Sequence, residues 1–388
     1  MDGAAPRVSP RFLRVGRSAL RDAESAVLEA VRAIDLCATR FVLVFLPETL
    51  DPHELSGLLS RHLDGVPFFG CTTAGQITGN GYEDDALLLL AFPKENFRCA
   101  SLLLDTLAPF SETQVATRAK RLSNNFNTTA GWNRLGFLFT DGLSKQEDLL
   151  ASTLDTVLGG FPIFGGSAGD GFRFEKTFLL CNGEIHCNAA LLLLVETDLE
   201  FQGLGFDHFL PSGPQIVITD ADPDERLVYE INGAPAAQEY ADLVGCAVED
   251  LSPQIFAEYP MLLRHNQRFY VRAVRNVTET DALSFLAAID DGLILTLGRG
   301  KEIIETLEAG LDLCDRKGQA PDFILGFDCA LRKLEIRQKQ LDRRVSEIFR
   351  NHRVLGFNTY GEQQSGVHMN QTFVGVAFFE PEPRAITP

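Results

Sequence analysis

Three apolar runs divide the chain into repeated units. They lie at residues 41–46, 135–139 and 323–327, and each precedes an amphipathic segment and a second apolar run that enters a glycine-containing loop. Continuous short apolar runs are typical of strands buried on both faces, and apolar residues at helical spacing predict helices that cover them. A further apolar run follows each loop. The repeated unit is therefore strand, helix, strand, loop, strand.

Helix-start signals stand where the units require them. In the first unit, Asp51 is a good N-cap and Pro52 suits the first helical position. In the second unit, Ser144 and Glu147 have the spacing of a capping box. In the third unit, apolar residues at helical spacing extend over residues 331–349, which predicts one long helix. Its charged face is interpreted either as a basic docking face or as a solvated helix surface.

A different pattern of short strand-like segments and turn residues occupies the chain between the second and third units, at residues 214–297. The sequence therefore predicts a mixed α/β (α+β) fold, in which the repeated units form mixed sheets covered by helices, and its length favours two domains. The predicted division is an N-terminal tail at 1–15, a first domain at 16–213 with two units, a second domain at 214–380 with the strand-rich insert and the third unit, and a C-terminal tail at 381–388.

The composition limits the classes of partner. The formal net charge of −18 would repel nucleic acid and anionic membrane surfaces. The apolar runs are too short to span a membrane and the N-terminus has no apolar signal core, so we expect a cytoplasmic protein without membrane insertion. The eight cysteines include no C-x-x-C pair, and we interpret them mainly as small buried residues.

The glycine loops are the first candidate binding site. Their backbone N–H groups and hydroxyls could hold a carboxylate or a phosphate. The same glycines could instead serve a turn of positive φ or close packing, and that interpretation is favoured for any single loop. The candidate ligand-binding residues are Gly165, Gly166, Ser167, Asp170, Thr72, Thr73, Asn358 and Tyr360.

Five segments of the chain carry a family resemblance. They are residues 69–75 (FGCTTAG), 139–143 (FTDGL), 164–170 (FGGSAGD), 229–233 (YEING) and 354–362 (VLGFNTYGE). Through them the chain resembles the FIST family, with its FIST N domain followed by a FIST C domain. The resemblance implies an intracellular sensor of a small ligand. Free-standing FIST haemoproteins sense nitric oxide and regulate a partner histidine kinase or a cyclic-di-GMP enzyme, and other FIST domains are thought to sense amino acids.

The resemblance makes haem b a suspected cofactor, and histidine is the commonest ligand of gas-binding haem. His368 is the first candidate for the axial ligand, because it lies on the loop between the third glycine motif and an apolar strand. His208 is the second candidate. An ordinary loop histidine is an equally acceptable interpretation of His368.

We expect no enzymatic activity. Asp141 and Asp170 follow strands, but no nucleophile, zinc signature or G-x-S-x-G elbow accompanies them, so we interpret both as caps or turn formers. The sequence leaves three hypotheses. The first is a haem-dependent nitric-oxide sensor in two-component or cyclic-di-GMP signalling, the second is a haem-free sensor of an amino acid or other small organic anion, and the third is a structural interaction protein. An oligomer is compatible with each of them.

Overall fold

The computed structural model describes residues 10–265 and 268–381. The mixed α/β fold and its repeated units are confirmed, and each unit contains more than the predicted elements: a strand and a helix before the first apolar strand, and a short β-hairpin after the glycine loop. The first unit contains β1 (Arg14–Ser18), α1 (Ala23–Arg32), β2 (Thr39–Leu46), α2 (Pro52–His62), β3 (Phe68–Thr72), β4 (Gln76–Thr78), β5 (Gly81–Glu83) and β6 (Leu87–Pro93).

The second and third units repeat this order, and a strand-rich insert interrupts the third. The second unit contains β7 (Phe97–Leu104), α3 (Glu112–Asn125), β8 (Asn133–Thr140), α4 (Glu147–Leu158), β9 (Ile163–Ser167), β10 (Leu179–Cys181), β11 (Glu184–His186) and β12 (Ala190–Thr197). The third unit contains β13 (Phe201–Phe206), α7 (Ile303–Leu311), β22 (Phe323–Cys329), α8 (Ala330–Gln338), α9 (Asp342–Asn351), β23 (Val354–Thr359), β24 (Glu362–Gln364), β25 (Val367–Met369) and β26 (Phe373–Phe378).

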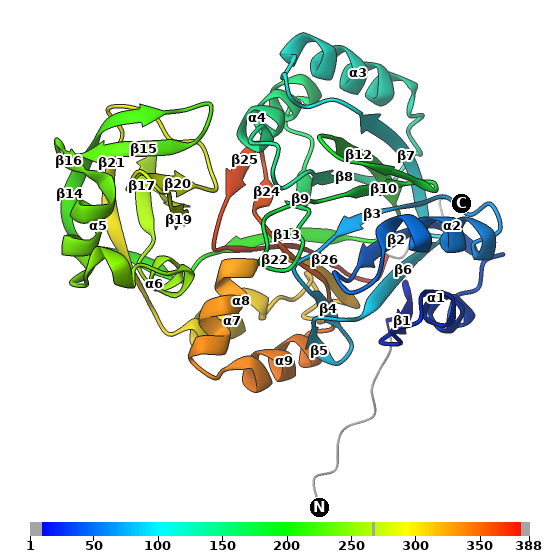
Figure 1. Cartoon of the computed structure of the whole chain (residues 1–388). Coiled ribbons are helices and arrows are strands. Elements are labelled where there is room, and N and C mark those ends of the chain that lie inside the picture. The colour runs from blue at the N-terminus through cyan, green and yellow to red at the C-terminus, as the bar shows by residue number, and fades with distance from the viewer. Residues whose placement is uncertain (1–9, 266–267, 382–388) are drawn as a thin grey trace, which may run out of the picture.

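The three units exchange their hairpins in a closed cycle. Each unit supplies four strands of a six-stranded sheet, and the hairpin of another unit completes the sheet. The hairpin β10–β11 of the second unit pairs with β3 of the first, β24–β25 of the third pairs with β9 of the second, and β4–β5 of the first pairs with β23 of the third. Because every sheet depends on a neighbouring unit, the three units form one body (Figure 1).

The body has helices outside and a core of aromatic side chains inside. The central strands are buried on both faces, which is why they read as continuous apolar runs. Their inward side chains meet in one cluster, where Phe45 stacks on Phe357 at 4.6 Å and contacts Phe139 at 6.0 Å between ring centroids. The outward side chains of each sheet pack under the helices that cover it. The units are thus held together by the centre that they share.

The insert lies beside the body and has its own core (Figure 1). It contains β14 (Phe209–Asp222), β15 (Leu227–Ile231), β16 (Ala234–Pro235), α5 (Ala236–Val244), a 3₁₀ turn (Val248–Asp250), α6 (Pro253–Glu258), β17 (Met261–His265), β18 (Arg268–Arg272), β19 (Val274–Val277), β20 (Leu283–Phe285) and β21 (Ile294–Gly300). The predicted second domain, 214–380, thus spans most of the insert and the third unit, while the third unit shares the central core with the first two. The domain division at residue 213 stays a prediction.

The predicted helix at 331–349 is two helices, α8 and α9, and this expectation was wrong. The break lies at Gln340, whose φ of 57° cannot continue a right-handed helix. The expected basic face is also absent from α8, because Arg332, Lys333 and Glu335 are fully buried. The apolar spacing of the two helices happened to run in phase across the break.

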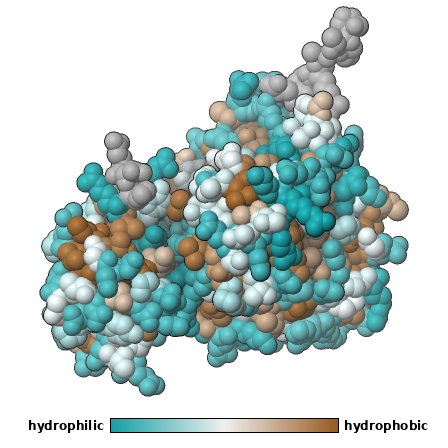
Figure 2. Space-filling view, turned by 90° about the horizontal axis from the view of Figure 1, so that it is seen from above, coloured by the Kyte–Doolittle hydropathy of each residue, from teal (hydrophilic) through white to brown (hydrophobic). Residues whose placement is uncertain are grey.

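On the face seen in Figure 2, the surface is mainly hydrophilic over the body, and apolar side chains gather on part of the insert. Among the described residues, no helix combines the length and the apolar character needed to cross a bilayer.

Candidate functional site

The three glycine loops meet at one point of the body, which we call the hub and define as residues 72–75, 167–170 and 358–361. They meet because the strands before them, β2 with β3, β8 with β9 and β22 with β23, run parallel and end together. Backbone bonds join all three loops: Ala74 N donates to Asn358 O at 2.9 Å, Gly169 N to Thr72 O at 3.0 Å and Tyr360 N to Ser167 O at 3.2 Å. The candidate ligand-binding residues are therefore brought together, although they come from three units.

The hydroxyls of the hub are already engaged within the protein. Thr73 Oγ1 donates to Leu46 O at 3.0 Å, and Thr72 Oγ1 accepts from Phe178 N at 3.0 Å. Ser167 Oγ accepts from Gln363 Nε2 at 2.8 Å. All three side chains are buried. These three hydroxyls therefore hold the glycine loops in place.

Close packing accounts for Gly165 and Gly166. A Cβ atom at Gly165 would lie 1.8 Å from the carbonyl oxygen of Leu138, and one at Gly166 would lie 2.3 Å from Cγ2 of Thr359. No side chain fits at either distance, so both positions need glycine whether or not a ligand binds.

Asp170 and Tyr360 form the polar connection between the second and third loops. Asp170 accepts from the backbone N–H groups of Phe174, Glu175 and Lys176 at 2.8–2.9 Å, and from the phenol of Tyr360. Burial, together with the neighbouring carboxylate, raises the pKa of Tyr360, which keeps the phenol a donor. Asp170 is thus a turn former, and Asp141 acts similarly by accepting from Leu143 N at 2.9 Å.

Beside the hub lies a group of buried polar atoms without protein partners. These atoms are Asn358 Oδ1, Gln363 Oε1, His368 Nε2, Asn370 Oδ1, Gln371 Oε1 and Arg272 Nε. An unpartnered buried polar atom costs about 1–3 kcal/mol, so native proteins usually satisfy it with water, an ion or a ligand. Several such atoms in one region indicate a candidate site for a polar ligand.

Three of these residues lie next to one another, and the fourth, Arg272, lies near them. The position of a Cβ at Gly361 is 2.8 Å from His368 Nε2 and 3.1 Å from Asn370 Nδ2, so both side chains lie against this glycine. Gln363 Nε2 donates to His368 Nδ1 at 3.1 Å. Arg272, on β18 of the insert, is close enough to lower the pKa of His368 electrostatically. We call Gln363, His368, Asn370 and Arg272 the seam site, because it lies between the body and the insert.

The insert is held at this seam by a buried arginine. Arg226 donates to Glu147 Oε2 at 2.8 Å, to Asp148 Oδ2 at 3.0 Å and to Leu286 O at 2.6 Å. Glu147 and Asp148 begin α4 of the body, whereas Arg226 and Leu286 belong to the insert. A second contact joins Gln371 Nε2 to Ala257 O at 2.6 Å. The seam site is therefore bordered by contacts on which the position of the insert depends.

The residues around His368 do not fit a haem-iron ligand. The amide nitrogen of Gln363 also contacts the Gly361 carbonyl at 3.3 Å, which accepts only, so this nitrogen is a donor and His368 Nδ1 accepts from it. Burial lowers the pKa of His368, and the neutral ring then carries its proton on Nε2. Nε2 has no lone pair for iron in this state, and it faces Gly361 and Asn370 rather than an apolar cavity.

His208, the second histidine candidate, has both ring nitrogens occupied. Its Nε2 lies 2.7 Å from Glu335 Oε2, and its Nδ1 lies 3.1 Å from Arg332 Nη1. Arg332 can only donate, so Nδ1 accepts, and burial lowers the pKa of His208 to keep it neutral. Arg332 in turn pairs with Asp328 at 3.0 Å. His208 thus belongs to a structural network that joins α8 to the start of the insert.

Sequence reasoning missed Gln363, Asn370 and Arg272. The first two lie on and just after the exchanged hairpin β24–β25, which has too few residues for a strand pattern. Arg272 comes from the insert, and only the fold brings it near His368. A weak signal was present in Asn370-Gln371, two amides between strand-like segments where one would expect apolar residues.

Comparison with known proteins gives two family matches that follow each other along the chain. The FIST N domain matches residues 40–234, and the FIST C domain matches residues 236–365. A protein of Methanocaldococcus jannaschii, described only as uncharacterized, is 23% identical over 380 residues, covering 87% of this chain and 73% of that protein. The FIST N match alone covers half of the chain.

Proposed function

Because the chain belongs to the FIST family, we propose that it is a small-ligand sensor in signal transduction whose ligand binds at the seam site. The observation that carries this proposal is the set of buried, unpartnered polar atoms on Gln363, His368, Asn370 and Arg272. A ligand that forms hydrogen bonds with these atoms removes the free-energy cost of leaving them buried without partners. The hub holds these residues in place, so its glycine loops position the site.

The donors and acceptors of the seam site define the ligand chemistry. Gln363 Oε1 and Asn370 Oδ1 accept hydrogen bonds, whereas His368 Nε2–H and Arg272 Nε donate them. A small organic molecule with N–H or O–H donors at one end and a carboxylate at the other satisfies both sets. An amino acid or a hydroxy acid has this arrangement. The haem-free alternative of the sequence analysis is thus our first proposal.

A signal would pass through the insert. The residues that would contact the ligand belong to both the body and the insert. A bound ligand therefore favours the position in which the body and the insert are in contact. The ion pairs of Arg226 with Glu147 and Asp148 lie beside the site and join the insert to the body in that position. A partner histidine kinase or cyclic-di-GMP enzyme that contacts the insert would read the change. The support for such a partner is the FIST resemblance alone.

Haem-dependent nitric-oxide sensing stays a prediction, with the FIST resemblance as its support. The polar, proton-bearing surroundings of His368 argue against that residue as the axial ligand. An absorption spectrum of protein expressed with a haem precursor tests the cofactor directly, since bound haem gives a Soret band that shifts with nitric oxide.

Thermal unfolding in the presence of ligands tests the proposal. The wild-type chain is heated with a panel of amino acids and small hydroxy acids, and at least one is expected to raise Tm by several degrees. His368→Leu removes the Nε2 donor, and His53→Leu changes an exposed histidine on α2 as a control. The control should respond as the wild type and His368→Leu should not. A panel without effect, or an equal response of all three proteins, would contradict the proposal.

A further inference from the structure

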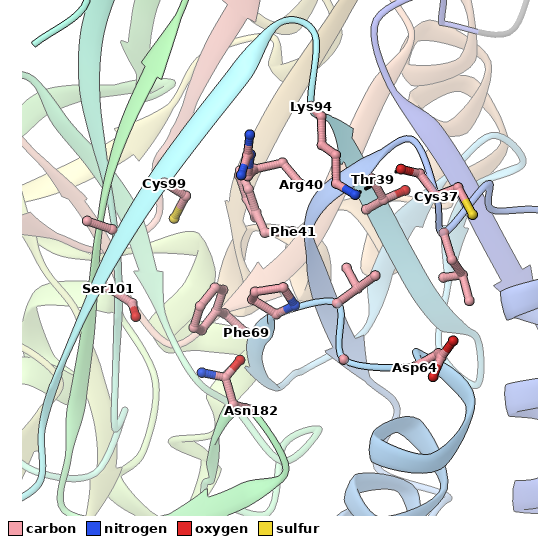
Figure 3. A pocket seen from close by; sticks show the side chains of 15 residues that line it. Cys37, Thr39, Arg40, Phe41, Asp64, Phe69, Lys94, Cys99, Ser101 and Asn182 are labelled. Carbon is pink, nitrogen blue, oxygen red and sulfur yellow. Dashed lines mark hydrogen bonds between the residues drawn. The ribbon is translucent and has the colours of Figure 1, made fainter. Parts of the chain in front are cut away.

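A cavity of about 570 Å³ lies at the opposite end of the sheets from the hub. It opens at the start of β2 and β3, between the edge strand β7 and the turn that joins β10 to β11. The length of β2 separates it from the hub by roughly 20 Å. Pockets of small-molecule ligands are commonly about 300–1,000 Å³, so this cavity is large enough for one. Arg40 and Lys94 lie at one end of it, and Phe69 and Asn182 at the other (Figure 3).

Because the chain is built of three repeated units, Arg40 can be compared with the residues at the same position of the other two units. Val42 pairs with Phe68 in the first unit, Gly136 with Ile163 in the second and Ile324 with Val354 in the third. Counting two residues back from the first member of each pair places Arg40, Arg134 and Asp322 at the same position of the three units. The surroundings of these three residues can therefore be compared directly.

In the second unit, this arginine has a carboxylate and two aromatic rings as neighbours, although its Nε and Nη2 atoms make no hydrogen bond within the described residues. Arg134 Nε lies 3.4 Å from Glu196, its cross-strand neighbour on β12. The guanidinium lies 5.4 Å from the ring centroids of both Phe126 and Phe161. In the third unit, Asp322 lies 3.9 Å from Arg353. Two of the three positions thus carry a compensating charge from the chain itself.

In the first unit, the corresponding partners are missing. Counting along the strands from the matched pairs places Pro93 at the position of Glu196 and Val66 at that of Phe161, although the register of β2 with β6 shifts here and pairs Pro93 with Thr39. Arg40 is exposed, and among the described residues its side chain has no ion-pair or hydrogen-bond partner. Val66, which lines the cavity, has no ring at the position that Phe161 occupies in the second unit. An arginine without a counter-charge in a chain of net charge −18 is a local site for an anion.

The remaining walls suit an aromatic group. Phe69 is a buried member of the central core and presents its ring to the cavity. Asn182 uses Oδ1 to accept from Phe68 N at 3.0 Å, which leaves its amide N–H groups toward the cavity. Lys94 donates to the Cys37 carbonyl at 2.8 Å and adds a second positive charge near Arg40. The cavity thus has Arg40 and Lys94 at one end and the ring of Phe69 in its floor, while polar residues that include Asp64 make up much of the remaining lining.

We propose that this cavity binds a small aromatic carboxylate. The ligand carboxylate takes the place on Arg40 that Glu196 takes on Arg134, and the ligand ring takes the place of Phe161. The chain supplies both groups itself in the second unit, which defines what a ligand must supply in the first. This site is separate from the seam site, and neither proposal depends on the other.

Calorimetric titration at low salt tests the proposal, with phenylacetate and 2-naphthylacetate as probes. Phenylacetamide removes the charge and acetate removes the ring, so neither should bind measurably. Arg40→Gln should weaken phenylacetate binding at least about tenfold, because the variant loses the charge-assisted hydrogen bond to the carboxylate. Val66→Phe fills the cavity with the ring that the second unit carries, and should abolish binding. Arg121→Gln, an exposed arginine on α3, is the matched control and should bind as the wild type.

Each outcome decides the question. Wild-type binding of the aromatic carboxylates that Arg40→Gln weakens and Val66→Phe abolishes supports the site. No binding by the wild type overturns the proposal, as do equal binding of phenylacetate and phenylacetamide or unchanged binding by both cavity variants. His368→Leu should retain phenylacetate binding, so failure of this site and failure of the seam site are distinguishable.

Discussion

The phenol of Tyr360 in the third glycine loop donates a hydrogen bond to the carboxylate of Asp170 in the second. The same phenol oxygen accepts from the backbone N–H groups of Asp170 at 3.2 Å and Phe174 at 3.3 Å. The ring of Phe174 stacks on that of Tyr360 at 4.3 Å, and Arg275 of the insert contacts the Phe174 carbonyl at 3.1 Å. One hydroxyl therefore connects two repeated units and the segment that faces the insert.

Tyr360→Phe is expected to destabilise the chain by about 1–3 kcal/mol, because it leaves a buried carboxylate oxygen and two backbone donors with fewer partners. Urea unfolding measures the change. Tyr229→Phe is the control, since Tyr229 is exposed on β15 of the insert and should show no change. A Tyr360→Phe protein as stable as the control would contradict the role given to this bond.

Arg226→Gln should destabilise the docking of the insert by about 3 kcal/mol, because Glu147 would be left buried without its charge partner. Limited proteolysis should then cut the insert faster than in the wild type. The double variant with Glu147→Gln should recover part of the loss, since no unpaired charge remains. Strictly additive effects of the two substitutions would show that the pair is not coupled.

The stability of the chain should depend on pH through Glu362. Burial raises the pKa of this carboxyl to about 8 from an ordinary value of 4.5. Between these two pH values the folded chain holds a proton that the unfolded chain has released, so the free energy of unfolding falls as pH rises. We expect a fall of more than about 1 kcal/mol, which is the value of one pKa unit.

Glu362→Gln provides the comparison for this pH dependence. The amide oxygen can accept from Thr372 N and Oγ1, which donate to Glu362 Oε2 at 3.2 and 2.6 Å, and the amide nitrogen can donate to Thr359. Urea unfolding of both proteins on either side of neutral pH measures the difference. The gap in stability should grow in favour of the variant as pH rises. A constant gap would show that Glu362 titrates in the ordinary range.

The break between α8 and α9 predicts opposite effects of two substitutions at Gln340. A left-handed residue costs about 1–2 kcal/mol unless it is glycine, and β-branched residues tolerate it least. Gln340→Gly should keep or raise Tm, whereas Gln340→Val should lower it. Equal Tm values for Gln340→Val and Gln340→Gly would contradict the left-handed conformation at this residue and indicate one continuous helix.

The strands and their repeat were predictable because burial on both faces leaves a continuous apolar pattern, as in residues 41–46. The hairpin exchange was not, since β4–β5 and its counterparts have three-residue strands and nothing local specifies which sheet they join. The break at Gln340 was hidden because the apolar spacing continued across it.

The candidate site was predictable only in part. Glycine motifs mark the hub, because close packing and turns impose glycine at fixed places, as at Gly165. The seam site depends on Arg272 and His368 coming together from distant parts of the chain, which no sequence pattern records. The polar character of Gln363 and Asn370 has meaning only once their burial is known.

The hairpin cycle bears on how such a chain could arise. A lone unit would leave the far edge of its sheet unpaired and its own hairpin without a sheet to join. Three identical copies of that unit could complete the same cycle between separate chains, as a ring with three-fold symmetry. The present body has the arrangement that such a trimer would have if its three chains were joined into one polypeptide. The units of a single chain can differ in sequence, as they do where Arg134 pairs with Glu196 in the second unit while Arg40 has no such partner in the first.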